Sequence, residues 1–425
     1  MKQYILNVMC RSLEWEKREE IAACVSRGYG VIVLDKDPIA YAGFNVDHFI
    51  SCDVTDVEGA MSLALSYISK HGLAIAGVVG WTDTGVYLVA QLALELGLPG
   101  THPDKVAAVK DKVETRKLLE MVEGANPSYR IGHTVADLED AILSVGVPCI
   151  LKYPGASGGR GIIKIDDEPD DINALYIRFR SLCDPSKDAV FKHQLSQFLV
   201  EKQVRGSEHS IAGMVYKGKV TILAIVDKQV EPQVGYQYRN SLPSGLPILV
   251  QNQMCEIARK AILKSGTESC GFHVDIMVEN NIPYVLEIGG RLGGECINSH
   301  IIPMASGNAV KPYEMLIDIV TGKDVTFDED YRTRLTRPAC MLSLYSTRYG
   351  RITAMHGLDT CRELPGVKSV LQVRKVGDTI SPPSEKYNAL VYAHVLMTHD
   401  SLPALEKATD HLRHTVMADV TSTQV

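Results

Sequence analysis

The sequence predicts an α/β protein that begins with a parallel sheet and carries functional groups on a later hairpin. Three observations lead to this prediction. Short apolar runs alternate with helical patterns over roughly the first hundred residues, a glycine-rich loop lies between two apolar strands, and two further strands flank Asn280 and Asn281. Alternating strands and helices favour a parallel, doubly wound sheet, whereas a polar pair between two strands favours a hairpin.

The opening domain is expected to span residues 1–102. Its strands are predicted at residues 4–9, 31–34 and 77–79, and its helices at residues 14–26, 57–70 and 86–96. No G-x-G-x-x-G follows the first strand, which excludes a dinucleotide-binding domain of the usual kind. Asp83 follows a strand and opens a helix, which is where open α/β sheets bind ligands. Asp83 is therefore a candidate substrate contact, although helix capping explains it equally well.

The composition argues against several classes of partner. The formal net charge of −7 disfavours a dominant nucleic-acid or acidic-membrane partner. The most apolar candidate span, residues 74–99, is interrupted by Asp83 and Glu95, so no membrane-spanning helix is expected. The ten cysteines include no C-x-x-C pair and lie mostly in apolar segments, which favours free thiols in a reducing cytoplasm.

A second group of elements is predicted between residues 103 and 165. A basic helix begins at Pro103 and carries Lys112, a helix covers residues 135–145, and an apolar strand ends at Lys152. The loop that follows contains four glycines and one serine: Gly155, Ser157, Gly158, Gly159 and Gly161. Glycines let backbone N–H groups approach a phosphate chain closely, and Lys152 supplies a point charge beside them. The loop lacks the Walker sequence, and a flexible hairpin turn is the alternative interpretation.

Two acidic residues stand at strand positions between residues 198 and 211. Glu201 and Glu208 each neighbour apolar residues, and half-buried carboxylates usually have a partner. An adenine amino group and ribose hydroxyls would provide such partners, and so would a lysine elsewhere in the chain. Residues 231–247 form a long polar and aromatic loop, which is typical of a substrate-facing element or of a surface excursion.

The hairpin at residues 271–288 carries the strongest chemical signal. Apolar residues alternate with polar ones before the Asn280-Asn281 turn, so Asp275 and Glu287 are predicted to lie opposite one another on one face. Two facing carboxylates repel unless a cation joins them, and oxygen ligands suit Mg2+. The alternative is a surface hairpin with solvated acids. The glycine-rich segment after Glu287 presents Arg291, which indicates an anion beside the metal.

The remaining segment is predicted to add one more α/β unit. Residues 251–265 and 299–321 have helical patterns, residues 339–345, 367–376 and 390–397 resemble strands, and residues 402–417 form a last helix.

These motifs, in this order, resemble the ATP-grasp superfamily of carboxylate-amine ligases. The matching features are Lys112 in KDK, Lys152 before GASGGRG, the strand pair FLVEKQVRGSEHS, and VDIMV followed by YVLEIGGRLGGE. The resemblance implies an ATP-grasp fold: a Rossmann-like parallel-sheet domain at residues 1–102, an ATP-grasp domain at 103–330 with a small lid subdomain near 125–203, and a C-terminal α/β domain at 331–425. It also implies ATP and Mg2+ as cofactors.

The resemblance further implies a role for each matching residue. Lys112 and Lys152 would contact the α- and β-phosphates, and residues Ser157 to Gly161 would close over them. Glu201, Lys202 and Val204 would line the adenine pocket, and Glu208 would bind the ribose hydroxyls. Asp275 and Glu287 would hold Mg2+. Arg291 would stabilise the anionic acyl-phosphate and tetrahedral species.

One departure from the superfamily pattern bears on the branch. Many members have Glu-x-Asn-x-Arg at the metal loop, whereas Gly289 occupies the middle position here, which leaves the number of metal ions open. The EIGGRLGGE form, with His273 before Asp275 and Ser299-His300 after the loop, is similar to bacterial L-amino-acid ligases, which synthesise dipeptides. His273 and Glu295 are therefore candidate substrate contacts, the second for an ammonium group, although a solvated surface acid explains Glu295 equally well.

The expected activity is ATP-dependent amide formation between a carboxylate and an amine, both small molecules and amino acids in the simplest case. Superfamily members are often homodimers. The alternatives are a ligase for formate or bicarbonate of the purine-pathway or biotin-carboxylase kind, a ligase for a secondary-metabolite precursor, and an ATP-binding module without chemistry. The intact set of lysines, acids and arginine disfavours the last alternative.

Overall fold

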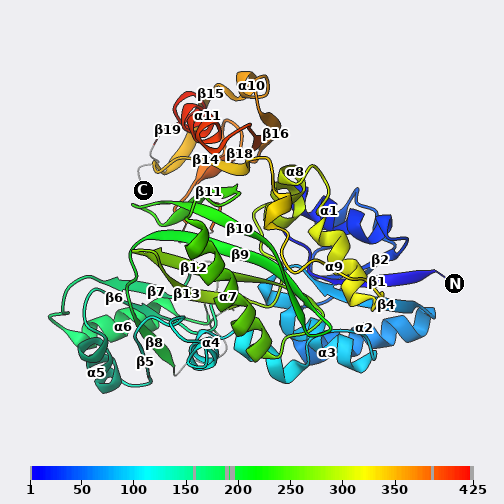
Figure 1. The fold of residues 1–425 in the computed structure, drawn as a ribbon, viewed down its shortest axis with the longest axis horizontal. Coiled ribbons are helices and arrows are strands. Elements are labelled where there is room, and N and C mark those ends of the chain that lie inside the picture. Colours follow the sequence, from blue (N-terminus) through cyan, green and yellow to red (C-terminus); the bar gives the residue numbers. More distant parts are fainter. Residues whose placement is uncertain (1, 157–158, 187–190, 192–196, 384–386, 422–425) are drawn as a thin grey trace.

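The computed structural model describes residues 2–156, 159–186, 191, 197–383 and 387–421. The amino-terminal part, a central sheet, a small sheet at one corner and the carboxy-terminal part can be followed by colour in Figure 1. No helix among the described residues is long and apolar enough to cross a membrane.

The amino-terminal part contains the predicted parallel sheet. Its strands are β1 (Gln3–Val8), β2 (Gly30–Asp35), β3 (His48–Ser51) and β4 (Ala74–Gly80), in the spatial order β3-β2-β1-β4. The helices α1 (Glu14–Ser26), α2 (Val57–His71) and α3 (Val86–Glu95) confirm the predicted alternation, with short 3-10 turns η1 (Pro38–Tyr41) and η2 (Asp83–Gly85) between elements. Sequence reasoning missed β3 because it has four residues, of which His48 and Ser51 are polar.

Helices cover both faces of this sheet. Alternate residues of β1 fall in two apolar clusters: Ile5 packs with residues of α1 and of the distant helix α9 (Pro312–Val320), and Leu6 packs with residues of α2 and α3. Arg27 pairs with Glu314 and Asp318 on α9. The chain after residue 311 therefore returns to complete the first domain.

The central sheet has eight strands in the order β13-β12-β9-β10-β11-β14-β18-β16. Their bounds are β9 (Ser207–Tyr216), β10 (Lys219–Glu231), β11 (Tyr236–Leu242), β12 (Cys270–Glu279), β13 (Ile282–Gly289), β14 (Ala339–Tyr345), β16 (Val367–Gln372) and β18 (Val391–Thr398). Helix α7 (Ile248–Ser265) packs on β9, β10 and β13. Because β11 pairs with β14, this one sheet runs through the boundary predicted at residue 330.

The small sheet at the lower left of Figure 1 lies within residues 125–203. Its strands β5 (Tyr129–Gly132), β8 (Phe198–Lys202), β6 (Cys149–Lys152) and β7 (Ile162–Ile165) are antiparallel neighbours in that order. Helices α5 (Val135–Val145) and α6 (Ile172–Leu182) belong to the same unit and share its apolar cluster. Ser157 and Gly158 of the predicted phosphate loop lie outside the described residues.

The carboxy-terminal part adds a sheet of three strands, β17 (Thr379–Ile380), β15 (Gly350–His356) and β19 (Met417–Thr421), with helices α10 (Leu358–Cys361) and α11 (Leu402–Thr415). The helical stretch predicted at residues 299–321 is divided into η5 (Ile297–Ile301), α8 (Ile302–Ala305) and α9. Gly307 and Asn308 have positive φ there, which ends a helix. A short turn, η6 (Arg332–Arg334), precedes β14.

The basic helix predicted from Pro103 is also divided in two. A 3-10 segment, η3 (Pro103–Val109), is followed by α4 (Lys112–Leu119). The Asp111 side chain accepts hydrogen bonds from the N–H groups of Val113 and Glu114, so it caps a new helix. Lys112 is thereby the first residue of α4, directed to the hairpin β12-β13.

Candidate functional site

The two carboxylates of the hairpin face one another as the sequence predicts. Asp275 on β12 is paired with Glu287 on β13 in the antiparallel ladder, and the connecting Asn280 and Asn281 both have positive φ, as a tight two-residue turn requires. A β-bulge shifts the ladder between Asp275 and Ile276. The hairpin therefore presents two acids at one place on the sheet.

Each of these carboxylates is held by a lysine. Lys228 Nζ lies 2.7 Å from Asp275 Oδ2, and Ser210 Oγ donates to Asp275 Oδ1 at 2.6 Å. Lys112 Nζ lies 3.1 Å from Glu287 Oε2. Burial raises the pKa of both acids, but the lysine charges outweigh it and lower the pKa of each below its ordinary value. Both acids are thus ionised at neutral pH, as carboxylate ligands of a cation must be.

The imidazole of His273 joins this pair. One ligand atom each from His273, Asp275 and Glu287 lie within 4.8 Å of one another. Burial and the charge of Arg291 lower the pKa of His273, so the ring is neutral at pH 7. Carboxylate oxygens and a neutral imidazole are common ligands of divalent cations, so the donor set fits a metal.

Lys152 on β6 and Glu201 on β8 form a buried ion pair between neighbouring strands of the small sheet. Lys152 Nζ lies 2.5 Å from Glu201 Oε2, and Arg116 Nε lies 2.5 Å from Glu201 Oε1. Burial opposes ionisation of Glu201, but the two cations lower its pKa to about 2. Each carboxylate oxygen of Glu201 already accepts a hydrogen bond from Arg116 or Lys152. The adenine contact expected of Glu201 stays a prediction, and in it one of these oxygens would also accept a hydrogen bond from the base.

The other residues assigned to nucleotide binding come from α4, from the glycine loop and from the chain between the end of β8 and the start of β9. Lys112 Nζ donates to the carbonyl of Ala156 at 2.5 Å, which links α4 to the start of the glycine loop. Gly159 and Gly161 have positive φ of 72° and 67°, a conformation that L side chains rarely adopt. Glu208 lies 3.2 Å from Lys228 Nζ. Lys202 is exposed, and Val204 is buried at the start of the turn to β9.

Arg291 is fixed by a residue of the first domain. Its Nε and Nη2 atoms donate to the two oxygens of Asp83, at 3.1 and 2.5 Å, and its Nη1 donates to the carbonyl of Leu292 at 2.9 Å. Burial opposes ionisation of Asp83, yet the guanidinium holds the pKa of that carboxyl far below its usual range. The structure thus brings Asp83 to the site through Arg291.

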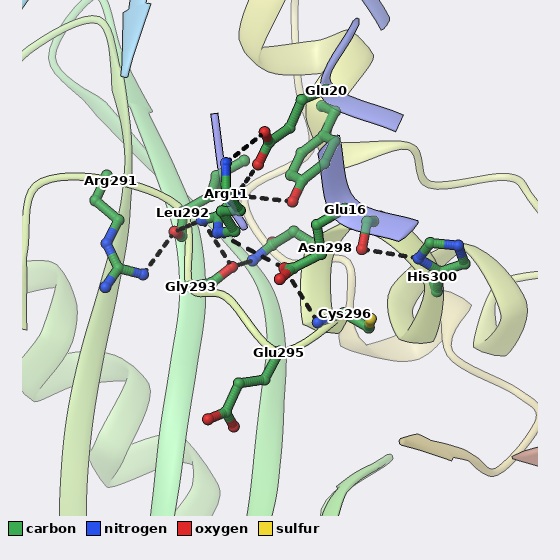
Figure 2. A network of polar contacts seen from close by, with 12 residues as sticks. Arg11, Glu16, Glu20, Arg291, Leu292, Gly293, Glu295, Cys296, Asn298 and His300 are labelled. Atoms are coloured by element: carbon green, nitrogen blue, oxygen red, sulfur yellow. Dashed lines mark hydrogen bonds and ion pairs between the residues drawn. The ribbon is translucent and has the colours of Figure 1, made fainter. Parts of the chain in front are cut away.

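The loop that carries Arg291 is also held by Arg11, which sequence reasoning missed. Arg11 Nη2 donates to the carbonyls of Leu292 at 2.5 Å and Gly293 at 3.3 Å, and Nη1 donates to Glu20 at 2.6 Å (Figure 2). Glu16 Oε1 accepts a hydrogen bond from the N–H of Cys296 at 3.1 Å. In Figure 2 the guanidinium of Arg291 reaches the same carbonyl of Leu292, whereas the side chain of Glu295 points away from the network.

Replacing Arg11 is expected to destabilise the protein strongly. Arg11→Met leaves the buried Glu20 without its cation, which costs about 3–5 kcal/mol when one partner of a buried pair is removed. Urea unfolding followed by circular dichroism measures this difference. The matched variant is Arg18→Met. The side chains of Arg18 and its partner Glu14 are 60% and 58% exposed, so this variant is expected to lose less than about 1 kcal/mol of unfolding free energy. Equal losses would contradict the role of Arg11.

Glu295 contacts two polar side chains of β11. Its Oε2 atom accepts hydrogen bonds from Gln237 Nε2 at 2.6 Å and from Asn240 Nδ2 at 2.7 Å. Burial raises the pKa of Glu295 to about 7, although the hydrogen bond from Asn240 lowers it. No hydrogen bond to Oε1 is found among the described residues, so this oxygen can accept one from a ligand.

Several residues of the site were not singled out from the sequence. They are the cations and acids that hold the predicted groups in place: Arg11, Glu16, Glu20, Arg116 and Lys228. Lys228 carried a recognisable signal, because a lysine within the apolar strand sequence ILAIVDKQV needs a buried partner. The partners of Arg11 lie 5 to 302 residues away in sequence, and those of Arg116 lie 10 to 170 residues away. No local pattern identifies them.

Comparisons with known proteins agree with this architecture. Residues 145–299 match the ATP-grasp domain, residues 26–100 match the ATP-grasp N-terminal domain, and residues 343–421 match the L-amino acid ligase C-terminal domain 2. Carnosine synthase 1 of Mus musculus is 27% identical over 299 residues, which cover 66% of this chain and 36% of that protein. The chain thus spans about a third of the length of that relative.

Two solved structures share the fold along nearly the whole chain. L-amino acid ligase from Bacillus licheniformis superposes with a TM-score of 0.83 at 18% identity and covers 99% of each chain. The biotin carboxylase domain of 2-oxoglutarate carboxylase from Hydrogenobacter thermophilus, in complex with MgADP and bicarbonate, gives 0.73 at 17% identity over 98% of this chain and 90% of that one. The predicted ATP-grasp fold and its similarity to L-amino acid ligases are confirmed. This chain belongs to the ATP-grasp superfamily.

Proposed function

We propose that the protein is an ATP-dependent, ADP-forming ligase that joins a small carboxylic acid to an amine, with amino acids as the simplest substrates. The observation that carries the proposal is the ionised Asp275–Glu287 pair beside Arg291. A site of paired carboxylates, several buried cations and one fixed guanidinium suits the transfer of a phosphoryl group to a carboxylate. The match to the L-amino acid ligase C-terminal domain 2 supports an amino acid as one substrate.

The reaction has two steps. A carboxylate oxygen of the acid attacks the γ-phosphorus of ATP, which gives an acyl phosphate and ADP. The amine nitrogen then attacks the acyl carbon, phosphate leaves, and the nitrogen loses a proton. Both steps depend on holding anions together in the right orientation, so the protein needs cations and N–H donors more than a nucleophile.

Each group of site residues has a separate role in this reaction. Lys112 and Lys152 would neutralise the phosphates of ATP near the glycine loop, and Glu208 would bind the ribose. Asp275 and Glu287 would hold Mg2+, which supplies positive charge against the transferred phosphoryl group. Arg291 would donate to the acyl phosphate and to the oxyanion of the second step, because its bonds to Asp83 and Leu292 leave two N–H groups.

Glu295 would bind the ammonium group of an amino-acid substrate through its open Oε1 atom. A carboxyl group with a pKa of about 7 is ionised only above that pH, so its attraction for an ammonium group weakens as the pH falls below 7. We expect the KM of that substrate to rise by about tenfold per pH unit below this value.

Steady-state kinetics between pH 5.5 and 8.5 measure this dependence. The variant Glu295→Gln keeps the shape and the contacts with Gln237 or Asn240 but has no titrating group, so its KM is expected to be high and independent of pH. The two proteins differ only at residue 295, so a pH dependence found in the wild type alone is assigned to Glu295. A wild-type KM that does not change over this range would remove Glu295 from substrate binding.

The experiment that tests the function is phosphate release from ATP and Mg2+ across a matrix of amino acids and small carboxylic acids, with mass spectrometry of the active mixtures. Release that requires both an acid and an amine, with ADP and a condensed product, supports the ligase. Release with bicarbonate or formate alone would overturn it in favour of the carboxylase or purine-pathway kind of ligase.

A further inference from the structure

The position of His273 in the hairpin places it beside the two facing carboxylates, Asp275 and Glu287. His273 precedes Asp275 by two residues on β12, so both side chains lie on the same face. On β13 the residue paired with His273 is Gly289, which follows Glu287 by two residues. The imidazole, Asp275 and Glu287 therefore occupy three of the four positions in one patch of the sheet, and Gly289 is the fourth.

The backbone fixes which nitrogen of His273 can bind a cation. Nδ1 lies 3.1 Å from the carbonyl oxygen of Arg291. A carbonyl oxygen only accepts hydrogen bonds, so Nδ1 carries the hydrogen and the neutral ring has its lone pair on Nε2. No hydrogen bond to Nε2 is found among the described residues, although the His273 residue is only 6% exposed. A buried ring with one nitrogen anchored to a carbonyl and the other open is the arrangement of metal-binding histidines.

Gly289 makes room for this ring. A Cβ atom added at Gly289 would lie 1.9 Å from Cε1 of His273 and 2.5 Å from its Nδ1. Gly289 does not have a positive φ, so its backbone conformation alone does not require glycine. The glycine is needed because the imidazole fills the space in which a side chain from β13 would otherwise reach the same cation.

We propose that His273 Nε2 is the third protein ligand of the divalent cation held by Asp275 and Glu287. This inference rests on the proposed function in one respect, namely that these two acids hold the cation. A nitrogen ligand binds transition-metal ions more strongly than it binds Mg2+. The protein is therefore expected to prefer Mn2+ or Co2+ over Mg2+. This preference is expected to be stronger than that of a site with two carboxylates alone.

Pulsed electron paramagnetic resonance of Mn2+ bound to the full chain with ADP tests this ligand without turnover. A directly bound histidine gives a nitrogen modulation that changes when the protein is labelled with 15N-histidine. We expect this change in the wild-type protein and in His300→Ala, whose histidine lies eleven residues beyond Gly289. We expect no histidine signal in His273→Ala.

Affinity provides a second measurement. Titration with Mn2+ in the presence of ADP is expected to show about tenfold or more weaker binding to His273→Ala, with a smaller loss for Mg2+. The double variant His273→Ala/Gly289→Asn, in which the removed ring leaves room for an amide oxygen, is expected to recover Mn2+ binding without the histidine signal. Thermal unfolding of each variant checks that the effect is local, and an unchanged melting temperature is expected.

The results separate this inference from the proposed function. Bound Mn2+ without a histidine signal in the wild-type protein would overturn the role of His273 and leave the two carboxylates as ligands. No Mn2+ binding with ADP would overturn the metal site itself, and with it the inference. A histidine signal in a protein that shows no ligase turnover would support His273 and contradict the proposed reaction.

Discussion

The variant Glu287→Gln is expected to lose ligase turnover by on the order of 10³-fold. The substitution keeps the shape of the side chain and removes the charge that faces Asp275 across the hairpin. A site that loses one of two carboxylate ligands binds its cation weakly, and a cation in such a site supplies several kcal/mol of charge stabilisation in the transition state. Because the side chain of Glu287 is 33% exposed, the fold is expected to tolerate the amide.

Coupled assays of ADP formation at increasing Mg2+ concentration measure this loss. The matched control is Glu279→Gln, at the turn end of the same hairpin, where the carboxylate accepts a hydrogen bond from the N–H of Arg205. That control is expected to keep turnover within about threefold of the wild type, since surface substitutions have small effects. Turnover of Glu287→Gln close to that of Glu279→Gln would show that the cation is held elsewhere.

The pairing of Asp275 with Glu287 was predictable from the sequence, but part of its cause was not. The Asn280-Asn281 turn and the alternation of apolar residues define a hairpin and the inward face of each strand. An unbroken ladder from the pair of Glu279 and Ile282 would place Leu286 opposite Asp275. The bulge between Asp275 and Ile276 places Glu287 there instead, and no residue type in the sequence indicates a bulge at that point.

The parallel sheet of the first domain was predictable for the same kind of reason. Its strands and helices are separated by short local signals, and the structure differs from the prediction mainly by the short strand β3. The contribution of α9 to one of the two helix layers was not predictable, because α9 comes from residues 312–320 and packs there through contacts such as Val320 against Gly77. Local patterns define elements, whereas the choice of distant packing partners depends on the whole chain.

The ion pairs of the site illustrate this limit most clearly. The sequence indicated that Glu201 needed a partner and left several candidates open, and it gave Asp83 as a substrate contact or a helix cap. In the structure Glu201 pairs with Lys152 and Arg116, and Asp83 pairs with Arg291, 208 residues away. A buried acid predicts that a cation is near, but the identity of that cation follows from topology.

The pairing of Asp83 with Arg291 leads to the second large expected effect. Arg291→Ala is expected to lower kcat by on the order of 10²- to 10³-fold with little change in the binding of ATP. The guanidinium is held on one side by Asp83, so its remaining N–H groups have a fixed direction before the substrate arrives. Loss of a preorganised donor to a developing anion reduces stabilisation of the transition state more than that of the ground state.

The partner variants decide whether Arg291 acts through its charge or through its orientation. Asp83→Asn keeps the size of the side chain but weakens the two-point contact, so we expect an intermediate loss of kcat, on the order of tenfold. Because Asp83 would act only through Arg291, the double variant is expected to be no slower than Arg291→Ala alone. Losses that add fully would mean that Asp83 contacts the substrate itself, and an unchanged kcat in Arg291→Ala would remove the guanidinium from the reaction.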